Sequence, residues 1–353
     1  MVKRLKENTI LITGGAGFLG INLIRYLLNK RFTNIRSLDM ATFDYPERDH
    51  IQTIQGDIRD RETVRKAVQD VDWVVHAAAA LPLYSKEDIY STDIQGTEYL
   101  LEEAFQAGID RFIHISSTAV YGIPDHSPIL ETDALEGVGF YGQAKIQAEK
   151  LCSAYRHKGL TVSILRPKSF IGPERLGAFE LLYNWACDGR NFPIVGNGSN
   201  RYQLLDVKDL CHAICLCAIG GRDKTNGTFN IGAREFSSLR QDFQAVLDEA
   251  GFGKKVVPFP RGLSVAVLRL MELLHLSPIY KWIYKTAGKD SCVAIEKAEK
   301  LLGFHPRHTN QQALLRNYHW YLDNRCRLNS AAAGVSHRTP WHHGVLRFLR
   351  IFF

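Results

Sequence analysis

Short, mainly apolar runs alternate along the first half of the chain with longer amphipathic segments. Such runs, rich in β-branched and aliphatic residues, are typical of strands buried on both faces. The strands predicted in this way are Thr9–Thr13, Ile35–Asp39, Ile51–Gln55, Trp73–His76, Arg111–Ser116 and Thr161–Arg166. The helices predicted between them are Phe18–Asn29, Arg61–Val68, Thr92–Ala107 and Tyr141–Lys158. This alternation predicts an α/β fold with a doubly wound parallel sheet, the Rossmann fold.

Beyond Pro167 the pattern becomes less regular, with glycine and proline marking loops. Shorter helices are predicted at Phe179–Asp188, Val207–Ile219, Leu239–Ala250 and Leu263–Leu274, and strands near Gln203–Leu205 and Thr228–Ile231. We therefore expect a Rossmann domain at 1–170 and a smaller α/β domain at 171–326. Part of the chain near 203–232 would return to the first domain, and 327–353 would form a flexible extension.

Composition is ordinary for a globular protein of 353 residues, with 45% hydrophobic and 23% charged residues. The formal net charge is +7, and much of the excess lies at the two ends of the chain. Neither a basic stripe nor a nucleic-acid reading motif is present within the predicted fold, so a nucleic-acid partner is not expected. Small acidic ligands such as phosphates fit this charge balance.

The seven cysteines are an odd number, and no secretory signal precedes Thr9, which favours a reducing cytoplasm. Cys211 and Cys215 lie one helical turn apart on an apolar segment that also contains Cys217. Cysteines in this setting behave as small core residues. No metal site is predicted.

The apolar runs are all shorter than the roughly 20 residues that a membrane span requires. Residues 344–353 nevertheless alternate bulky apolar side chains with two arginines. This segment fits a short interfacial membrane anchor, a disordered extension or an addition to the natural chain. We expect a cytoplasmic protein, with weak membrane-surface contact through 344–353 as one alternative.

A glycine-rich turn, Gly14-x-x-Gly17-x-x-Gly20, joins the first predicted strand to the first helix. Glycines at this spacing let the backbone approach a pyrophosphate, and the helix start offers free N–H groups to the anion. Asp39 ends the second strand, where a carboxylate accepts the ribose hydroxyls of NAD and repels the 2′-phosphate of NADP. The pattern predicts NAD as cofactor.

Further cofactor contacts are expected after the third and fourth strands. Asp57 and Ile58 are placed to meet the adenine, and the small side chains of Ala77 and Ala78 allow close approach, although close packing alone would also explain the alanines. The residues that we expect to contact NAD are Gly14, Gly17, Phe18, Leu19, Gly20, Asp39, Asp57, Ile58, Ala77, Ala78, Tyr141, Lys145 and Pro167.

Tyr141 and Lys145 lie four residues apart, so they share one face of the predicted helix. An ammonium beside a phenol lowers the phenol pKa and makes the phenolate a usable base. Lys145 also has the reach to hold the nicotinamide ribose. Ser117, at the end of the fifth strand between Ser116 and Thr118, is the candidate to hydrogen-bond the same substrate oxygen. The three residues predict redox chemistry at a hydroxyl carbon.

Over residues 8–325 the chain resembles the extended short-chain dehydrogenase/reductase family, which contains NAD-dependent sugar epimerases and dehydratases. The motifs that carry the resemblance are Gly14-x-x-Gly17-x-x-Gly20, Asp39, Gly56-Asp57, Ser116 to Gly122, Tyr141-x-x-x-Lys145, Arg166-Pro167 with Gly172-Pro173, Gly196-x-Gly198 and Asp206-Val207-x-Asp209-Leu210. The resemblance implies Ser117, Tyr141 and Lys145 as catalytic residues. It also implies a homodimer formed through 92–107 and 141–158.

Within this family, sugar 4,6-dehydratases place an Asp-Glu pair just after the catalytic Thr. The corresponding residues here are Thr118 and Ala119, neither of which serves as acid or base, so dehydration is not expected. The stretch Ser117 to Tyr121 is similar to that of UDP-hexose 4-epimerases. The resemblance thus implies a nucleotide sugar that is oxidised at C4 with Tyr141 as base, rotates, and is reduced on its other face.

The chain departs from the family pattern at three places. Arg201, implied to bind nucleotide phosphates, is shifted by one position, and Asp93 replaces the usual Asn of an Asn-x-x-Gly-Thr motif. Lys168 follows Arg166-Pro167, where it would contact a phosphate or carboxylate or would simply be solvated. The expected substrate-binding residues are Ser117, Thr118, Lys168 and Arg201.

Two other functions stay open from the sequence. The family also contains 3β-hydroxysteroid dehydrogenase-like enzymes, which oxidise apolar alcohols, and residues 263–284 are apolar and aromatic enough for a lipid pocket or for core packing. A non-catalytic NAD-binding protein is the other alternative. The presence of Ser117, Tyr141 and Lys145 argues against it, because such a protein has no need of them.

Overall fold

The computed structural model describes residues 5–123, 125–260, 262 and 288–329. The predicted helix Leu263–Leu274, the whole apolar segment 263–284 and the C-terminal segment 344–353 lie outside the described residues.

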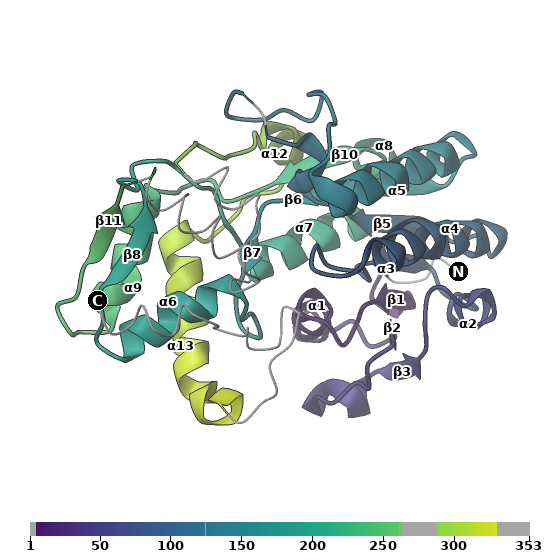
Figure 1. The fold of residues 1–353 in the computed structure, drawn as a ribbon. Coiled ribbons are helices and arrows are strands. Elements are labelled where there is room, and N and C mark those ends of the chain that lie inside the picture. Colours follow the sequence, from purple (N-terminus) through teal and green to yellow (C-terminus); the bar gives the residue numbers. More distant parts are fainter. Residues whose placement is uncertain (1–4, 124, 261, 263–287, 330–353) are drawn as a thin grey trace.

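Seven parallel strands form the main sheet of the described chain (Figure 1). They are β1 (Ile10–Thr13), β2 (Ile35–Asp39), β3 (Gln52–Gln55), β4 (Trp73–His76), β5 (Arg111–Ile115), β6 (Thr161–Pro167) and β10 (Thr228–Ile231). Their order is β10-β6-β5-β4-β1-β2-β3. The order reverses at β1, so the crevice for a ligand opens beyond the carboxyl ends of β1 and β4. The predicted doubly wound fold is confirmed, with strand ends that differ by one residue at most.

Alternation along the strands divides the core into two layers. Ile10 and Ile12 of β1 pack toward α1 (Phe18–Asn29) and α7 (Val207–Ile219), whereas Leu11 packs on the opposite side. That opposite layer contains α2 (Arg61–Ala67), α4 (Thr97–Gln106) and α5 (Gly139–His157). Cys211, Cys215 and Cys217 of α7 are buried in the first layer, in the core positions that we predicted.

The predicted helix Thr92–Ala107 differs in detail from the observed one. The helical segment begins earlier, with α3 (Lys86–Tyr90), passes through a π-helical turn, η3 (Ser91–Gly96), and continues as α4. A π-helical turn closes its hydrogen bonds one residue further along than an α-helix and often marks a functional site. Here it carries Asp93, which is buried.

The smaller part of the structure packs around the long helix α13 (Asn310–Asn329) (Figure 1). Its other elements are β7 (Phe170–Ile171), α6 (Ala178–Cys187), β8 (Phe192–Val195), β9 (Leu205–Asp206), α9 (Leu239–Glu249) and β11 (Val256–Phe259). Strand β8 pairs with β11, and β9 pairs with β7, so β9 stays outside the main sheet whereas β10 joins it.

Short elements complete the connections: η1 (Leu5–Glu7), η2 (Pro46–His50), η4 (Thr118–Tyr121), α8 (Arg222–Thr225) and α12 (Glu296–Leu302). Helix α13 continues to Asn329, past residue 327, where we expected the C-terminal extension to begin. Among the described residues, none of the helices combines the length and hydropathy that crossing a membrane requires.

Candidate active site

The glycine turn after β1 packs so closely against neighbouring backbone that side chains at Gly14 and Gly20 would collide with it. A Cβ placed on Gly14, whose φ is +71°, would lie 2.8 Å from the Ala78 backbone nitrogen. A Cβ on Gly20 would lie 2.2 Å from the Gly14 carbonyl oxygen, and Gly17 N donates to that same oxygen at 3.0 Å. No side chain caps the start of α1 at Gly17. The N–H groups of this first helical turn therefore face the turn, ready for an anion.

Asp39 lies beside this turn at the end of β2. Its carboxylate accepts hydrogen bonds from Ala16 N at 3.0 Å and from Ala41 N at 2.9 Å. The two amides fix the carboxylate next to the phosphate-binding turn. An oriented acceptor at this position suits a ribose diol and repels an additional phosphate.

The next predicted cofactor residues lie around the same crevice. Asp57 accepts from Arg59 N at 2.8 Å and pairs with the Arg59 guanidinium at 2.7 Å. Burial opposes the effect, but these hydrogen bonds from Arg59 hold the Asp57 pKa below its usual value. Ile58 is buried against Gly96, and Ala78 N donates to Thr13 Oγ1 at 3.3 Å.

Phe18 and Leu19, also predicted to contact the cofactor, begin α1 and are buried. The Phe18 ring stacks on Phe170 with centroids 5.4 Å apart. The Arg175 guanidinium lies 5.3 Å from the Phe18 ring centroid, and the positive charge of Arg175 lowers the pKa of Tyr141. Sequence reasoning missed Arg175, although the Gly172-Pro173 motif beside it was a signal.

The three predicted catalytic residues come together where β5 ends and α5 begins. Lys145 Nζ donates to the Ile115 carbonyl oxygen at 3.3 Å and lies 5.7 Å from the Tyr141 ring centroid. The Ser117 hydroxyl lies close enough to the Tyr141 phenol to lower the pKa of that phenol. Ser117 Oγ also accepts from Ala119 N at 3.1 Å, which caps η4 and fixes its rotamer.

The net pKa of Tyr141 is raised, because burial disfavours the phenolate more than its neighbours favour it. Lys145, Ser117 and Arg175 each lower the Tyr141 pKa, but the net shift is opposite to the predicted one. Asp93 raises the Tyr141 pKa. The protein without ligand therefore holds Tyr141 mainly as the phenol, and an additional positive charge at the site would favour the phenolate.

Ser116 and Ser117 are neighbours with different roles. The Ser116 hydroxyl donates to Glu149 at 2.5 Å. Glu149 in turn pairs with Arg166 on β6, while Pro167, the last residue of β6, is buried.

Lys168 is buried, with 4% of its surface exposed, so the prediction that it is simply solvated is wrong. Its ammonium donates to Ser291 Oγ at 2.7 Å and lies 4.8 Å from the Tyr202 ring centroid. Burial lowers the Lys168 pKa to about 8, partly offset by Cys292. Among the described residues, no carboxylate pairs with this lysine.

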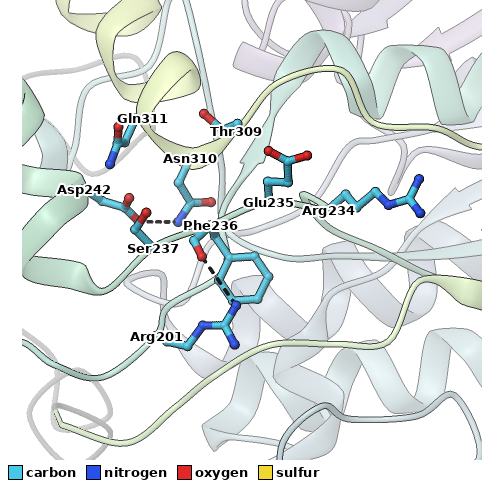
Figure 2. Close-up of a pocket in the computed structure, with 9 residues that line it drawn as sticks. All are labelled: Arg201, Arg234, Glu235, Phe236, Ser237, Asp242, Thr309, Asn310 and Gln311. Atoms are coloured by element: carbon cyan, nitrogen blue, oxygen red, sulfur yellow. Dashed lines mark hydrogen bonds between the residues drawn. The ribbon is translucent and has the colours of Figure 1, made fainter.

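Arg201 lines a pocket of about 340 Å³ in the smaller part of the structure (Figure 2). Its guanidinium lies 4.6 Å from the Phe236 ring centroid and donates to the Phe236 carbonyl oxygen at 3.4 Å. On the other wall Asn310 donates to Asp242 at 2.7 Å. The remaining lining residues are Arg234, Glu235, Ser237, Thr309 and Gln311. None of the three predicted catalytic residues lines this pocket.

A family model describes residues 10–232 as an NAD dependent epimerase/dehydratase. That stretch is more than half of the chain and contains the glycine turn, Asp39 and the Ser117, Tyr141 and Lys145 cluster. The chain belongs to the NAD dependent epimerase/dehydratase family.

Relatives of known sequence within or near this family carry different functions. An uncharacterized protein of Sinorhizobium fredii, y4nG, is 33% identical over 97% of this chain and 85% of its own length. The dTDP-glucose 4,6-dehydratase of Streptomyces niveus is 29% identical over 90% of this chain and 93% of its own. A 3 beta-hydroxysteroid dehydrogenase/Delta 5-->4-isomerase of Mycobacterium tuberculosis is 27% identical over 92% and 95%.

Solved structures share the fold. The UDP-glucose 4-epimerase of Thermotoga maritima superposes with a TM-score of 0.75 at 22% identity, covering 90% of this chain and 99% of that one. DesIV, a dTDP-glucose 4,6-dehydratase of Streptomyces venezuelae crystallised with NAD and TYD, gives a TM-score of 0.73 at 26% identity, covering 90% and 98%.

As a member of the epimerase/dehydratase family, the protein is an NAD-dependent enzyme. The residues present fit NAD. Gly14 and Gly20 permit a tight turn before and within the start of α1, which no side chain caps, and Asp39 offers an oriented acceptor to the ribose. When bound, NAD supplies a reversible hydride acceptor and a positively charged ring.

Proposed function

We propose that the protein is a nucleotide-sugar 4-epimerase of the UDP-hexose type. Its catalytic residues are Tyr141, Ser117 and Lys145, and NAD is used and regenerated within one turnover. The observation that carries the proposal is the contact of these three side chains beside Thr118 and Ala119, which lack the acid pair needed for water elimination. Dehydratases occur among the relatives, yet this chain has no side chain at 118 or 119 to protonate a leaving hydroxyl.

In the proposed reaction Tyr141 takes the proton of the sugar 4-hydroxyl and later returns it to the epimeric oxygen. Ser117 hydrogen-bonds the same oxygen and keeps it aligned with the phenol. Lys145, anchored on the Ile115 carbonyl, supports the phenolate by its charge. Net oxidation and reduction cancel, so no reduced cofactor accumulates.

Arg201 supports a nucleotide-linked substrate. Its guanidinium borders the pocket that Arg234, Glu235 and Asp242 also line, and a guanidinium there suits a phosphate group. Lys168 is the second predicted contact for an anionic group. It has one hydroxyl and one ring as its described neighbours, so an incoming carboxylate or phosphate would compensate its buried charge. Thr118 lies at the start of η4 beside Ser117 and completes the predicted substrate contacts.

The test is an assay of purified protein with UDP-glucose or UDP-galactose, following NADH absorbance and the sugar product together. Interconversion of the two sugars without net NADH is the expected result. Formation of a 4-keto-6-deoxy sugar would refute the proposal in favour of dehydration. Net NADH formation from either sugar would refute it in favour of oxidation.

A second candidate function is oxidation of an apolar alcohol with net NADH formation. Two observations favour it: the Mycobacterium relative named a 3 beta-hydroxysteroid dehydrogenase, and Phe140, which precedes Tyr141 and is 52% exposed. A sterol offered with added NAD would then yield NADH, whereas UDP-sugars would stay unchanged.

The proposed active unit is a homodimer formed through α4 and α5. These helices pack together, with Phe105 against Tyr155, and Phe105 keeps 41% of its surface exposed on their outer side. Sedimentation of the purified protein tests this, and Phe105→Asp is expected to shift it toward the monomer.

A further inference from the structure

Asp93 is a buried carboxylate within the catalytic cluster that the proposed mechanism does not use. It lies in the π-helical turn η3 with 1% of its surface exposed. Its Oδ1 accepts from Ala80 N at 2.7 Å. Its Oδ2 makes no hydrogen bond within the described residues and lies 3.7 Å from Lys145 Nζ, too far for a hydrogen bond but within ion-pair range.

A chain of buried hydrogen bonds holds Asp93 in place. Thr97 Oγ1 donates to the Asp93 carbonyl oxygen at 2.7 Å and meets His76 Nε2 at 2.9 Å. His76 Nδ1 meets Thr13 Oγ1 at 2.8 Å, directly before the glycine turn. The position of the carboxylate is thus tied to the strand that carries the cofactor turn, and its unused oxygen points to the catalytic lysine.

We propose that Asp93 is a positioning residue of this site, whose carboxylate fixes the Lys145 ammonium and by its charge opposes deprotonation of Tyr141. An amide at this position would keep the acceptor for Ala80 N and lose the charge. Tyr141 therefore needs an additional positive charge nearby before its phenol ionises. Ionisation of Tyr141 becomes coupled to a positively charged ligand at the site.

The other charged groups around Tyr141 and Lys145 do not substitute for Asp93. Arg175 and Lys145 are cations and favour the phenolate. His76 and His114 on β4 and β5 are buried and face Lys145, which keeps both neutral; burial, then Lys145, lowers the His76 pKa to about 3. Burial raises the Cys152 pKa, so that thiol also stays neutral. Within the described residues, Asp93 is the anion that raises the Tyr141 pKa.

The inference rests on the proposed role of Tyr141, so its test reads that phenol directly. Tyrosinate absorbance is titrated in the purified holoprotein and in Tyr141→Phe, and their difference isolates Tyr141. The same difference is taken between Asp93→Asn and Asp93→Asn/Tyr141→Phe. The expected result is a lower Tyr141 pKa in Asp93→Asn, with Asp93→Glu returning toward the wild type.

Activity gives the second readout, with whichever substrate the enzyme turns over. The acid limb of kcat/KM should move to lower pH in Asp93→Asn, which raises kcat/KM several-fold below that limb. A Tyr141 pKa that is unchanged or higher in Asp93→Asn would overturn the inference. If Asp93→Asn does not fold, Asp93→Ser, smaller and also neutral, carries the same test. The titration needs no substrate, so failure of the epimerase assay leaves it intact.

Discussion

Two buried ion pairs lie one turn apart on α5 and are built in opposite ways. Glu149 pairs with Arg166 at 2.5 Å and also accepts from Ser116, while Arg166 donates further to Tyr121 and to the Glu131 carbonyl oxygen. Lys145 lies 3.7 Å from Asp93, whose second oxygen makes no hydrogen bond in the described part of the chain.

The Glu149–Arg166 pair stabilises the fold, whereas the Lys145–Asp93 pair acts on the phenol of Tyr141. A buried ion pair is tolerated when every lone pair and proton is used, and the Glu149 network meets that condition. The Lys145–Asp93 pair leaves hydrogen-bonding capacity unused, so its charges remain available to the neighbouring phenol. The same helix thus supplies rigidity at one turn and adjustable electrostatics at the next.

The largest expected effect is that of Tyr141→Phe, which removes the phenol beside the Lys145–Asp93 pair. Loss of the phenolic oxygen removes the base, and kcat should fall about 10²- to 10⁴-fold. The free energy of unfolding should change by about 1 kcal/mol or less, since the substitution removes a single hydroxyl and keeps the ring. Steady-state kinetics and urea unfolding measure the two quantities.

Tyr155→Phe on the same helix is the matched control, because that ring packs against Phe105 away from the cluster. It should retain the wild-type rate. Activity of Tyr141→Phe within a few-fold of wild type would remove Tyr141 from the mechanism.

Glu149→Gln should show the reverse pattern in stability. The substitution leaves the Arg166 guanidinium buried without its counter-charge, which typically costs about 3–5 kcal/mol. Urea unfolding measures the loss, and Lys150→Gln, an exposed neighbour, should change stability by about 0.5 kcal/mol or less. If Glu149→Gln were as stable as the wild type, the contrast between the two pairs would be lost.

Lys168 lies between the two cases, as a buried cation without a carboxylate among the described residues. The folded protein binds its proton less tightly than the unfolded chain, because the Lys168 pKa falls from 10.5 to about 8 on folding. Stability should therefore rise with pH between these values, by up to about 3 kcal/mol from this group.

Lys168→Met does not titrate, so it isolates this contribution from the other groups that change at alkaline pH. Urea unfolding of both proteins from pH about 7.5 to about 10.5 should show the wild type gaining stability relative to the variant. A constant difference between them would mean that Lys168 keeps its proton on folding.

The smallest of these effects is expected at the exposed cation Arg201. Its removal should leave unfolding unchanged but weaken a diphosphate contact worth about 1.5–3 kcal/mol, which raises KM about 10- to 150-fold. Kinetics with the UDP-sugar substrate measure this for Arg201→Ala. Arg240→Ala, a nearby exposed arginine outside the pocket lining, is the control. Equal KM values in the two variants would exclude Arg201 from the substrate site.

Much of this architecture follows from local signals in the sequence. Short runs rich in β-branched and aliphatic residues predicted most strands of the main sheet, although β3, with the sequence QTIQ, is largely polar. The glycine turn and Asp39 were predictable because their spacing reflects a local backbone requirement. Tyr141 and Lys145 lie on one helix turn, so their proximity needed no tertiary information.

The features that were missed depend on contacts between distant segments. Asp93 stood out only as a departure from a motif, since its effect on Lys145 needs the packing of η3 against α5. The burial of Lys168 depends on Ser291, far along the chain. The pairs β7–β9 and β8–β11 join strands from separate stretches, and strands this short carry a weak periodic signal.

The π-helical turn at Ser91–Gly96 makes the orientation of Asp93 depend on the number of residues in this segment. Such a turn holds one residue more than an α-helical turn, so it is equivalent to a single-residue insertion. Deleting one residue there would restore a regular helix and rotate everything before the deletion by about 100° relative to α4. The direction of the Asp93 side chain therefore depends on the length of this segment. A homologue one residue shorter here would place its carboxylate elsewhere, and the pKa of its catalytic tyrosine would differ.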